Sequence, residues 1–202
     1  MHLDAALSVA IDLPFLHLQL KEMDPLQRFF IRSLTHCDVL SATVLCRRPA
    51  LFLRHIHNLN VGIGVQYLYG CTDQILAAIN QTADLEAWKT EQMAGGELSI
   101  SDLYKGGMRI LQQLLAMNRS WHNQSFSGAI ADTFLFAAII QVNVVMSGKV
   151  FFVLKTKSGA YSGLKELRKP LANLVEMVKF LMPRIDALKL ICWPIMIGIF
   201  VT

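Results

Sequence analysis

One stretch of the chain limits its folds more than any other, because it is long and almost free of charge. The 22 residues from Thr133 to Leu154 contain one charged residue, Lys149, and two side-chain amides. A run of about 20 apolar residues can cross a bilayer or form a helix that other helices surround. A lysine at the centre of a span costs about 2.5–3.5 kcal/mol. We therefore expect a buried helix over 125–146, ended by the Ser147–Gly148 pair.

A second apolar segment lies near the end of the chain. Leu190 to Val201 has 12 residues and contains Pro194 and Gly198. This length is too short for a membrane span and is typical of a buried helix. The two apolar segments hold most of the hydrophobic excess, and we expect them to form an edge that other parts of a larger protein cover. A small membrane-associated helical protein is the alternative interpretation.

Composition and charge exclude several classes of protein. Hydrophobic residues make up 53% of the 202 residues, so the chain has the apolar surface that a folded core needs and is not intrinsically disordered. The net charge of +4 is uneven, because residues 1–148 carry 10 basic and 12 acidic side chains, and residues 149–202 carry 9 and 3. No run of five like charges occurs, so a basic arm for nucleic acid is not indicated. We interpret the basic C-terminal quarter as a solvated helix face.

The hydrophobic pattern is helical almost throughout and predicts an all-α fold, an irregular bundle of about six to eight helices. Asp24 followed by Pro25 predicts the start of a helix that runs from Leu26 to Arg47. Thr72 is placed to cap the next helix. Glycine and proline fall between the periodic blocks, as expected for the connections of a bundle.

The spacing of apolar residues predicts which side of each helix is buried. The apolar positions of the first helix include Phe29, Phe30, Leu34, Cys37, Val44 and Leu45. The second should bury Ile75, Leu76, Ile79, Leu85 and Trp88. The third, capped by Ser99 or Ser101, should bury Leu103, Ile110, Leu111 and Leu114. The clearest amphipathic block ends before Pro183 and places on one face Leu164, Leu167, Leu171, Leu174, Val175, Val178 and Leu181.

The sequence contains no complete metal-ligating or nucleotide-binding pattern. Four scattered cysteines form no CxxC pair, and we expect buried thiols at Cys37, Cys46, Cys71 and Cys192. His55 and His57 form a close pair, but a zinc site needs three or four ligands, so no metal site is predicted. Gly62-x-Gly64 lacks the third glycine of a dinucleotide fingerprint.

No pattern of catalytic residues emerges, and we expect no enzyme. Asp73 with Asp84 or Glu86 would place carboxylates on one helix, which is common on solvated surfaces. Arg47 and Arg48 follow a predicted helix, where cations interact favourably with the helix dipole; a phosphate contact is the alternative. An unrecognised helical enzyme would draw its general base from His36, His55 or His122.

Three blocks, taken in order, resemble the regulatory domain of fungal zinc-cluster transcription factors, the fungal-specific transcription factor domain. The first is Cys37-Asp-Val-Leu-Ser-Ala42, followed by Arg47-Arg-Pro49. The second is Tyr69-Gly-Cys-Thr-Asp-Gln-Ile-Leu76, followed by Leu85-Glu-Ala-Trp-Lys89. The third is Leu190-Ile-Cys-Trp-Pro-Ile-Met-Ile-Gly198, in which a Trp-Pro pair starts a late core helix. The resemblance covers residues 25–200.

The resemblance implies an all-helical, non-catalytic regulatory module that works in the nucleus in the control of RNA polymerase II transcription. In the family, zinc is held by an N-terminal six-cysteine module that reads DNA, so this chain is expected to hold no cofactor and to bind no specific DNA by itself. Its partners would be proteins of the transcription machinery, and a homodimer and a small-molecule effector are further options. The matching family residues have structural roles: Asp38, Arg48, Pro49, Gly70, Trp193 and Pro194.

The chain departs from the family pattern at two places. A block similar to V-V-x-S-G-A-Y is interrupted, because Val144 to Gly148 is followed by Lys149 to Ser158 and only then by Gly159-Ala-Tyr161. We hypothesise that 149–158 is an insertion, such as an unspliced intron. The family also continues beyond the Trp-Pro block, so we expect 1–202 to be one helical regulatory domain that is incomplete.

Overall fold

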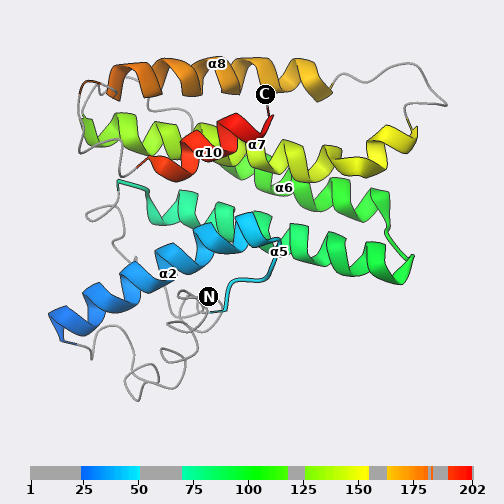
Figure 1. The fold of residues 1–202 in the computed structure, drawn as a ribbon, viewed down its shortest axis with the longest axis horizontal. Coiled ribbons are helices and arrows are strands. Elements are labelled where there is room, and N and C mark those ends of the chain that lie inside the picture. Colours follow the sequence, from blue (N-terminus) through cyan, green and yellow to red (C-terminus); the bar gives the residue numbers. More distant parts are fainter. Residues whose placement is uncertain are drawn as a thin grey trace.

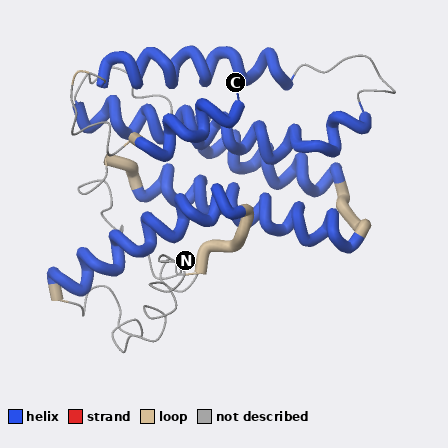
Figure 2. The backbone as a smooth tube through the Cα atoms, viewed as in Figure 1, coloured by secondary structure: helices blue, strands red, loops and turns tan. Residues whose placement is uncertain are grey.

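The computed structural model describes residues 24–50, 70–117, 126–154, 163–181, 183 and 191–201. In this part of the chain all regular structure is helical (Figure 2). The six helices are α2 (Pro25–Leu45), α5 (Asp73–Gly95), α6 (Ile100–Met117), α7 (Phe126–Leu154), α8 (Gly163–Leu181) and α10 (Cys192–Val201). This architecture confirms the all-α class, and its helix number lies within the predicted range.

Helix α7 is the central element of the bundle. It contacts α5, α6, α8 and α10, while α2 packs on α5 (Figure 1). By length and composition, Phe126–Ser147 could cross a membrane, but 83% of its most apolar window is buried inside the bundle. The predicted central helix is therefore confirmed. The expectation that 125–146 forms an exposed apolar edge is wrong, because the helices of the chain itself cover it.

The end of α7 differs from the sequence-based prediction. The helix continues through Ser147 and Gly148 to Leu154, instead of stopping near Met146. A glycine inside a helix costs about 1 kcal/mol relative to alanine, so it weakens a helix without forcing it to end. The Ser147 hydroxyl donates to the Val144 carbonyl oxygen at 3.2 Å, as serine does inside helices.

The predicted helix starts are confirmed by their caps. The Asp24 carboxylate accepts from the Gln27 amide at 2.9 Å, and the Gln27 side chain accepts from the Asp24 amide at 3.0 Å, which completes a capping box. The Thr72 hydroxyl accepts from the Ile75 amide at 3.3 Å at the start of α5. Of the two serines considered for α6, Ser99 accepts from the Asp102 amide. Side chains next to each helix therefore satisfy amides that the helix itself leaves free.

The predicted inward faces are confirmed for the two helices that flank α7. In α6 all four predicted residues are buried: Leu103, Ile110, Leu111 and Leu114. In α5, Ile75, Leu76 and Ile79 are buried, while Leu85 and Trp88 are half-buried. These helices follow apolar periodicity because each packs on neighbours along one side.

The apolar positions of α2 do not form its inward face. Most of its large apolar side chains are exposed: Phe29, Phe30, Cys37, Val44 and Leu45. The face that packs against the bundle instead contains Ile31, Thr35, His36, Asp38, Val39, Ala42 and Thr43. Four of these seven residues have polar side chains, so hydrophobic periodicity could not identify the face. Polar and aromatic contacts of these side chains, described below, offset the cost of burying them.

The expectation of four buried thiols is wrong for three cysteines. Cys71 is buried, whereas Cys37, Cys46 and Cys192 are exposed. Two of the exposed cysteines lie on or directly after α2, most of whose apolar positions are exposed. The third is the first residue of α10, where the side chain lies at the edge of the bundle.

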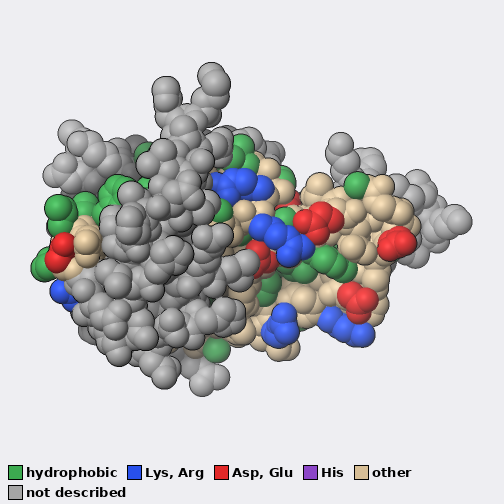
Figure 3. Space-filling model, turned by 90° about the horizontal axis from the view of Figure 1, so that it is seen from below, with side chains coloured by type: hydrophobic (Ala, Val, Ile, Leu, Met, Phe, Trp, Pro, Cys, Tyr) green, Lys and Arg blue, Asp and Glu red, His purple; other side chains and the backbone are tan. Residues whose placement is uncertain are grey.

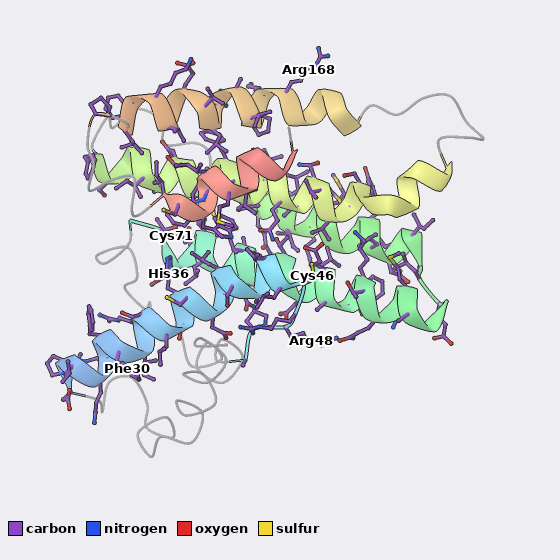
Figure 4. The ribbon with its side chains drawn as sticks, viewed as in Figure 1. Phe30, His36, Cys46, Arg48, Cys71 and Arg168 are labelled. Atoms are coloured by element: carbon purple, nitrogen blue, oxygen red, sulfur yellow. The ribbon has the colours of Figure 1, made fainter. Side chains whose placement is uncertain are left out.

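Helix α8 covers one side of α7 and carries the basic residues outside. Leu174 and Leu181 are buried and Leu171 and Val178 half-buried, as predicted, and the helix ends before Pro183. Val175 is 43% exposed, so its assignment to the inward face is wrong; the side chains of Leu164 and Leu167 lie outside the described residues. Arg168, Lys169 and Lys179 are exposed, and Figure 4 shows Arg168 pointing away from the bundle. This agrees with a solvated basic face.

Candidate functional site at the junction of α2, α5, α7 and α10

The family-motif residues of the first block surround the C-terminal end of α2. Asp38 has no exposed side-chain surface, and its Oδ1 lies 2.9 Å from Nη1 of Arg47. Arg47 follows the helix and folds back along it, where Nη2 also donates to the Ser41 hydroxyl at 3.0 Å. The ion pair neutralises a buried carboxylate, which would otherwise cost several kcal/mol. Asp38 therefore holds the end of α2 in place.

Arg48 connects the segment after α2 to α5. Its Nε and Nη2 donate to the two carboxylate oxygens of Glu91 at 3.2 and 2.8 Å. Both side chains are about half exposed, so the pair contributes at most about 1 kcal/mol. Pro49, the next residue, is buried. The two arginines bind carboxylates of this chain, and the phosphate contact is not supported.

Acidic and basic side chains also lie next to each other elsewhere on this side of the molecule. On the face shown in Figure 3 the two signs of charge are mixed instead of gathered into a basic patch.

Cys46 and Arg48 lie together near the C-terminal end of α2 (Figure 4). Cys46 has a φ of 50° and closes the helix as its left-handed C-cap. Burial and the nearby Glu86 carboxylate raise the pKa of its thiol, which disfavours the reactive thiolate.

The Trp193–Pro194 pair connects α10 to α2 and α7. The indole Nε1 of Trp193 donates to the Thr43 hydroxyl at 2.9 Å, across 150 positions in the chain. The indole ring also stacks on Phe134 of α7, with ring centroids 5.9 Å apart and planes 11° apart. Pro194 is buried in the first turn of α10, where its missing amide hydrogen leaves no bond unmade. The pair starts α10, as the resemblance predicted.

Gly70 fixes the approach of the chain to α5. Its φ is +73°, a conformation that residues with a side chain rarely adopt. A Cβ atom at this position would lie 2.5 Å from Cγ2 of Ile130 in α7. Cys71 and Thr72 follow directly, the first buried in the core and the second capping α5. Glycine is therefore required by both the backbone and the contact with α7.

Burial of His36 makes stability depend on pH. His36 packs edge-on against Phe134 with ring centroids 6.0 Å apart, and burial lowers its pKa from 6.5 to about 4. Between these values the unfolded chain binds a proton that the folded chain does not, so stability falls as the pH falls from 6.5 towards 4. From pH 7 to pH 5 the expected loss is about 2 kcal/mol. Urea unfolding at both pH values measures it.

A His36→Gln variant is the control for this prediction. Burial raises the pKa of the Asp84, Glu86 and Asp132 carboxyls, and these groups contribute the opposite trend in the acidic range. They are the same in both proteins, so the difference between the two pH profiles isolates His36. Equal pH dependence in the wild-type chain and the variant would contradict the prediction.

A sequence model described as the fungal specific transcription factor domain matches residues 1–198. The chain belongs to this family. No curated protein and no solved structure matches the chain significantly. Membership of a fungal-specific transcription factor domain family indicates a role in the regulation of transcription.

The described residues of this fungal-specific transcription factor domain hold no group of three metal-ligating side chains. The acids considered for catalysis face different partners: Asp84 accepts from Asn80, and Glu86 lies near Lys89. His36 is buried, which is unfavourable for a general base, and His55, His57, His122 and the Gly62-x-Gly64 motif lie outside the described residues.

Several residues of this site carried no signal in the sequence. Thr43, Phe134 and Lys89 contact motif residues or connect helices, yet each looks ordinary in its own segment. Their roles depend on helices that are far apart in the chain. The Trp-Pro pair was the strongest local signal, and the structure shows which partners it contacts.

Proposed function

We propose that this chain is the regulatory part of a fungal zinc-cluster transcription factor, without catalytic activity, that acts in the nucleus in the control of RNA polymerase II transcription. The family match over residues 1–198 is the observation that carries the proposal. The six motif residues support it, because those described above pack or pair between helices instead of gathering around a reactive centre. A zinc-binding DNA reader would lie in a separate module, and this chain would not recognise a DNA sequence by itself.

In this proposal the bundle provides a stable surface for proteins of the transcription machinery. Large apolar side chains are exposed along α2, including Leu26 at 75% and Leu45 at 56%. Exposed apolar surface of this kind is typical of sites that contact other proteins. Dimerisation and binding of a small-molecule effector belong to the same proposal, and so does the view that 1–202 is part of a longer protein.

A reporter experiment tests the proposal. The chain is fused to an unrelated sequence-specific DNA-binding domain, and transcription of a reporter with matching sites is compared with that of the DNA-binding domain alone. We expect a change in transcript level that Gly70→Ala removes and Gly95→Ala retains, because a Cβ at Gly95 meets nothing within 4 Å. Localisation of the full-length gene product gives a second measurement. An unchanged transcript level together with exclusion from the nucleus would contradict the proposal.

The alternative, a small membrane-associated protein, would use Thr133–Leu154 or the C-terminal helix as its anchor. By length and composition Phe126–Ser147 could span a bilayer, but it would have to leave its contacts with four other helices. Alkaline carbonate extraction of membranes separates the two functions. Our proposal expects the chain in the extracted fraction, and retention in the membrane pellet would favour the alternative.

A further inference from the structure

Two side chains bind main-chain carbonyls at one point of α7. Lys89 of α5 is 9% exposed, and its Nζ donates to the Val145 carbonyl oxygen at 2.8 Å. One residue earlier, the Val144 carbonyl accepts from the Ser147 hydroxyl at 3.2 Å. Carbonyls in the last turn of a helix lack partners within the helix, and lysine side chains commonly bind them there. This is the arrangement expected at a helix C-terminus, although α7 continues to Leu154.

Residues on both sides of this point fit the same interpretation. Gly148 follows Ser147, and glycine is the residue most often found directly after a helix end. Tight packing reaches this point: Val145 is fully buried, and Met146 lies so close to Gly107 of α6 that a Cβ there would meet its side chain. The last part of α7 bends out of the line of its earlier turns (Figure 1). Sharp bends in helices occur at Gly/Ser pairs and where side chains bind the backbone.

The connection to α8 agrees with an earlier helix end. Helices α7 and α8 run antiparallel and in contact, and the tip of α7 extends past the start of α8 (Figure 1). Without residues 149–158, the segment 159–162 would connect Gly148 to Gly163, the first residue of α8. Connections between helices of a bundle typically have about 2–8 residues. A four-residue connection is therefore sufficient for this antiparallel pair.

We propose that the folding unit ends α7 at Ser147, with Lys89 of α5 as the cap of its last carbonyls, and that residues 149–158 are an insertion that the fold does not need. The segment 149–154 extends the helix beyond this cap. In this proposal the insertion suspected from the sequence begins just after the capped end of the helix at Ser147.

A deletion of residues 149–158 tests the boundary. We expect the shortened chain to unfold cooperatively in urea with the midpoint of the full chain, and to lose helical signal only in proportion to the helical residues removed. A deletion of equal length within the core, 133–142, is the control and should abolish cooperative unfolding. A shortened chain that fails to fold, or whose folding equilibrium constant falls more than tenfold, would overturn the proposal.

Hydrogen exchange in the full chain tests the cap without any deletion. We expect the amides of 150–154 to exchange at least about 100-fold faster than those of 135–145, because the latter open only with the core. Lys89→Met should accelerate exchange near Val145, whereas Lys105→Met should not, since Lys105 is exposed and pairs only weakly with Asp102 at 3.8 Å. Uniform protection across α7, or equal effects of the two substitutions, would overturn the proposal.

Discussion

Trp193→Ala is expected to lower the free energy of unfolding by about 3–5 kcal/mol, the usual cost of truncating a buried aromatic side chain. Trp193 is 6% exposed and lies between α2 and α7. The substitution removes the stacking on Phe134 and leaves the Thr43 hydroxyl without its donor. Urea unfolding followed by circular dichroism measures the change.

Two further variants make the Trp193 prediction specific. Trp88→Ala removes a tryptophan that is half-buried in α5, and we expect a smaller loss. Trp193→Phe keeps an aromatic ring but loses the indole donor, so it should cost about 1–3 kcal/mol, mainly through the lost hydrogen bond to Thr43 and the smaller ring. The Thr43 hydroxyl keeps its own hydrogen bond to the Leu40 carbonyl oxygen. The role assigned to Trp193 is wrong if Trp193→Ala costs no more than Trp88→Ala.

Gly70→Ala is expected to lower the free energy of unfolding by about 2–4 kcal/mol, because backbone strain and a steric clash add at this position. A methyl group at a φ of +73° strains the backbone. The same methyl group would lie 2.5 Å from Cγ2 and 3.0 Å from Cβ of Ile130, close to the helix axis where the side chain cannot easily move. The loss should appear as a lower midpoint of urea unfolding.

Gly96→Ala separates the two penalties. Gly96 has nearly the same φ, +71°, but a Cβ there meets no atom within 4 Å. We expect Gly96→Ala to lower the free energy of unfolding only by the backbone strain, about 1 kcal/mol. The difference between the two variants then measures the contact of Gly70 with α7. Equal losses would show that the approach to Ile130 has no energetic effect.

Both predictions concern contacts that join distant parts of the chain. Thr43 and Trp193 are 150 positions apart, and Gly70 meets Ile130 in another helix. A substitution at these motif positions should therefore impair regulation by unfolding the domain instead of removing a reactive group.

The sequence predicted well those features that depend on neighbouring residues. The caps at Asp24 and Thr72 were visible because each side chain binds an amide three residues ahead. The buried face of α6 was visible because Leu103, Ile110 and Leu114 repeat with helical spacing. The central position of α7 followed from its lack of charge.

Other features could not be predicted, because they depend on where distant segments meet. The inward face of α2 contains Asp38 and Thr43, whose burial is possible only because Arg47 folds back and Trp193 arrives from α10. Phe29 and Val44 are exposed because the face of α2 that contains Asp38 and Thr43 packs against the bundle. The binding of Lys89 to α7 gives no signal in either segment.

The sequence by itself determined that this chain is helical, where most of its helices begin, and which helix must be surrounded by others. Hydrogen bonds and apolar repeats within a few residues carry that information. The tertiary structure alone decided which polar groups are buried, because the cost of burying a charge or a hydroxyl is offset only by a partner that folding brings to it. The contacts of the motif residues are therefore visible only in the tertiary structure.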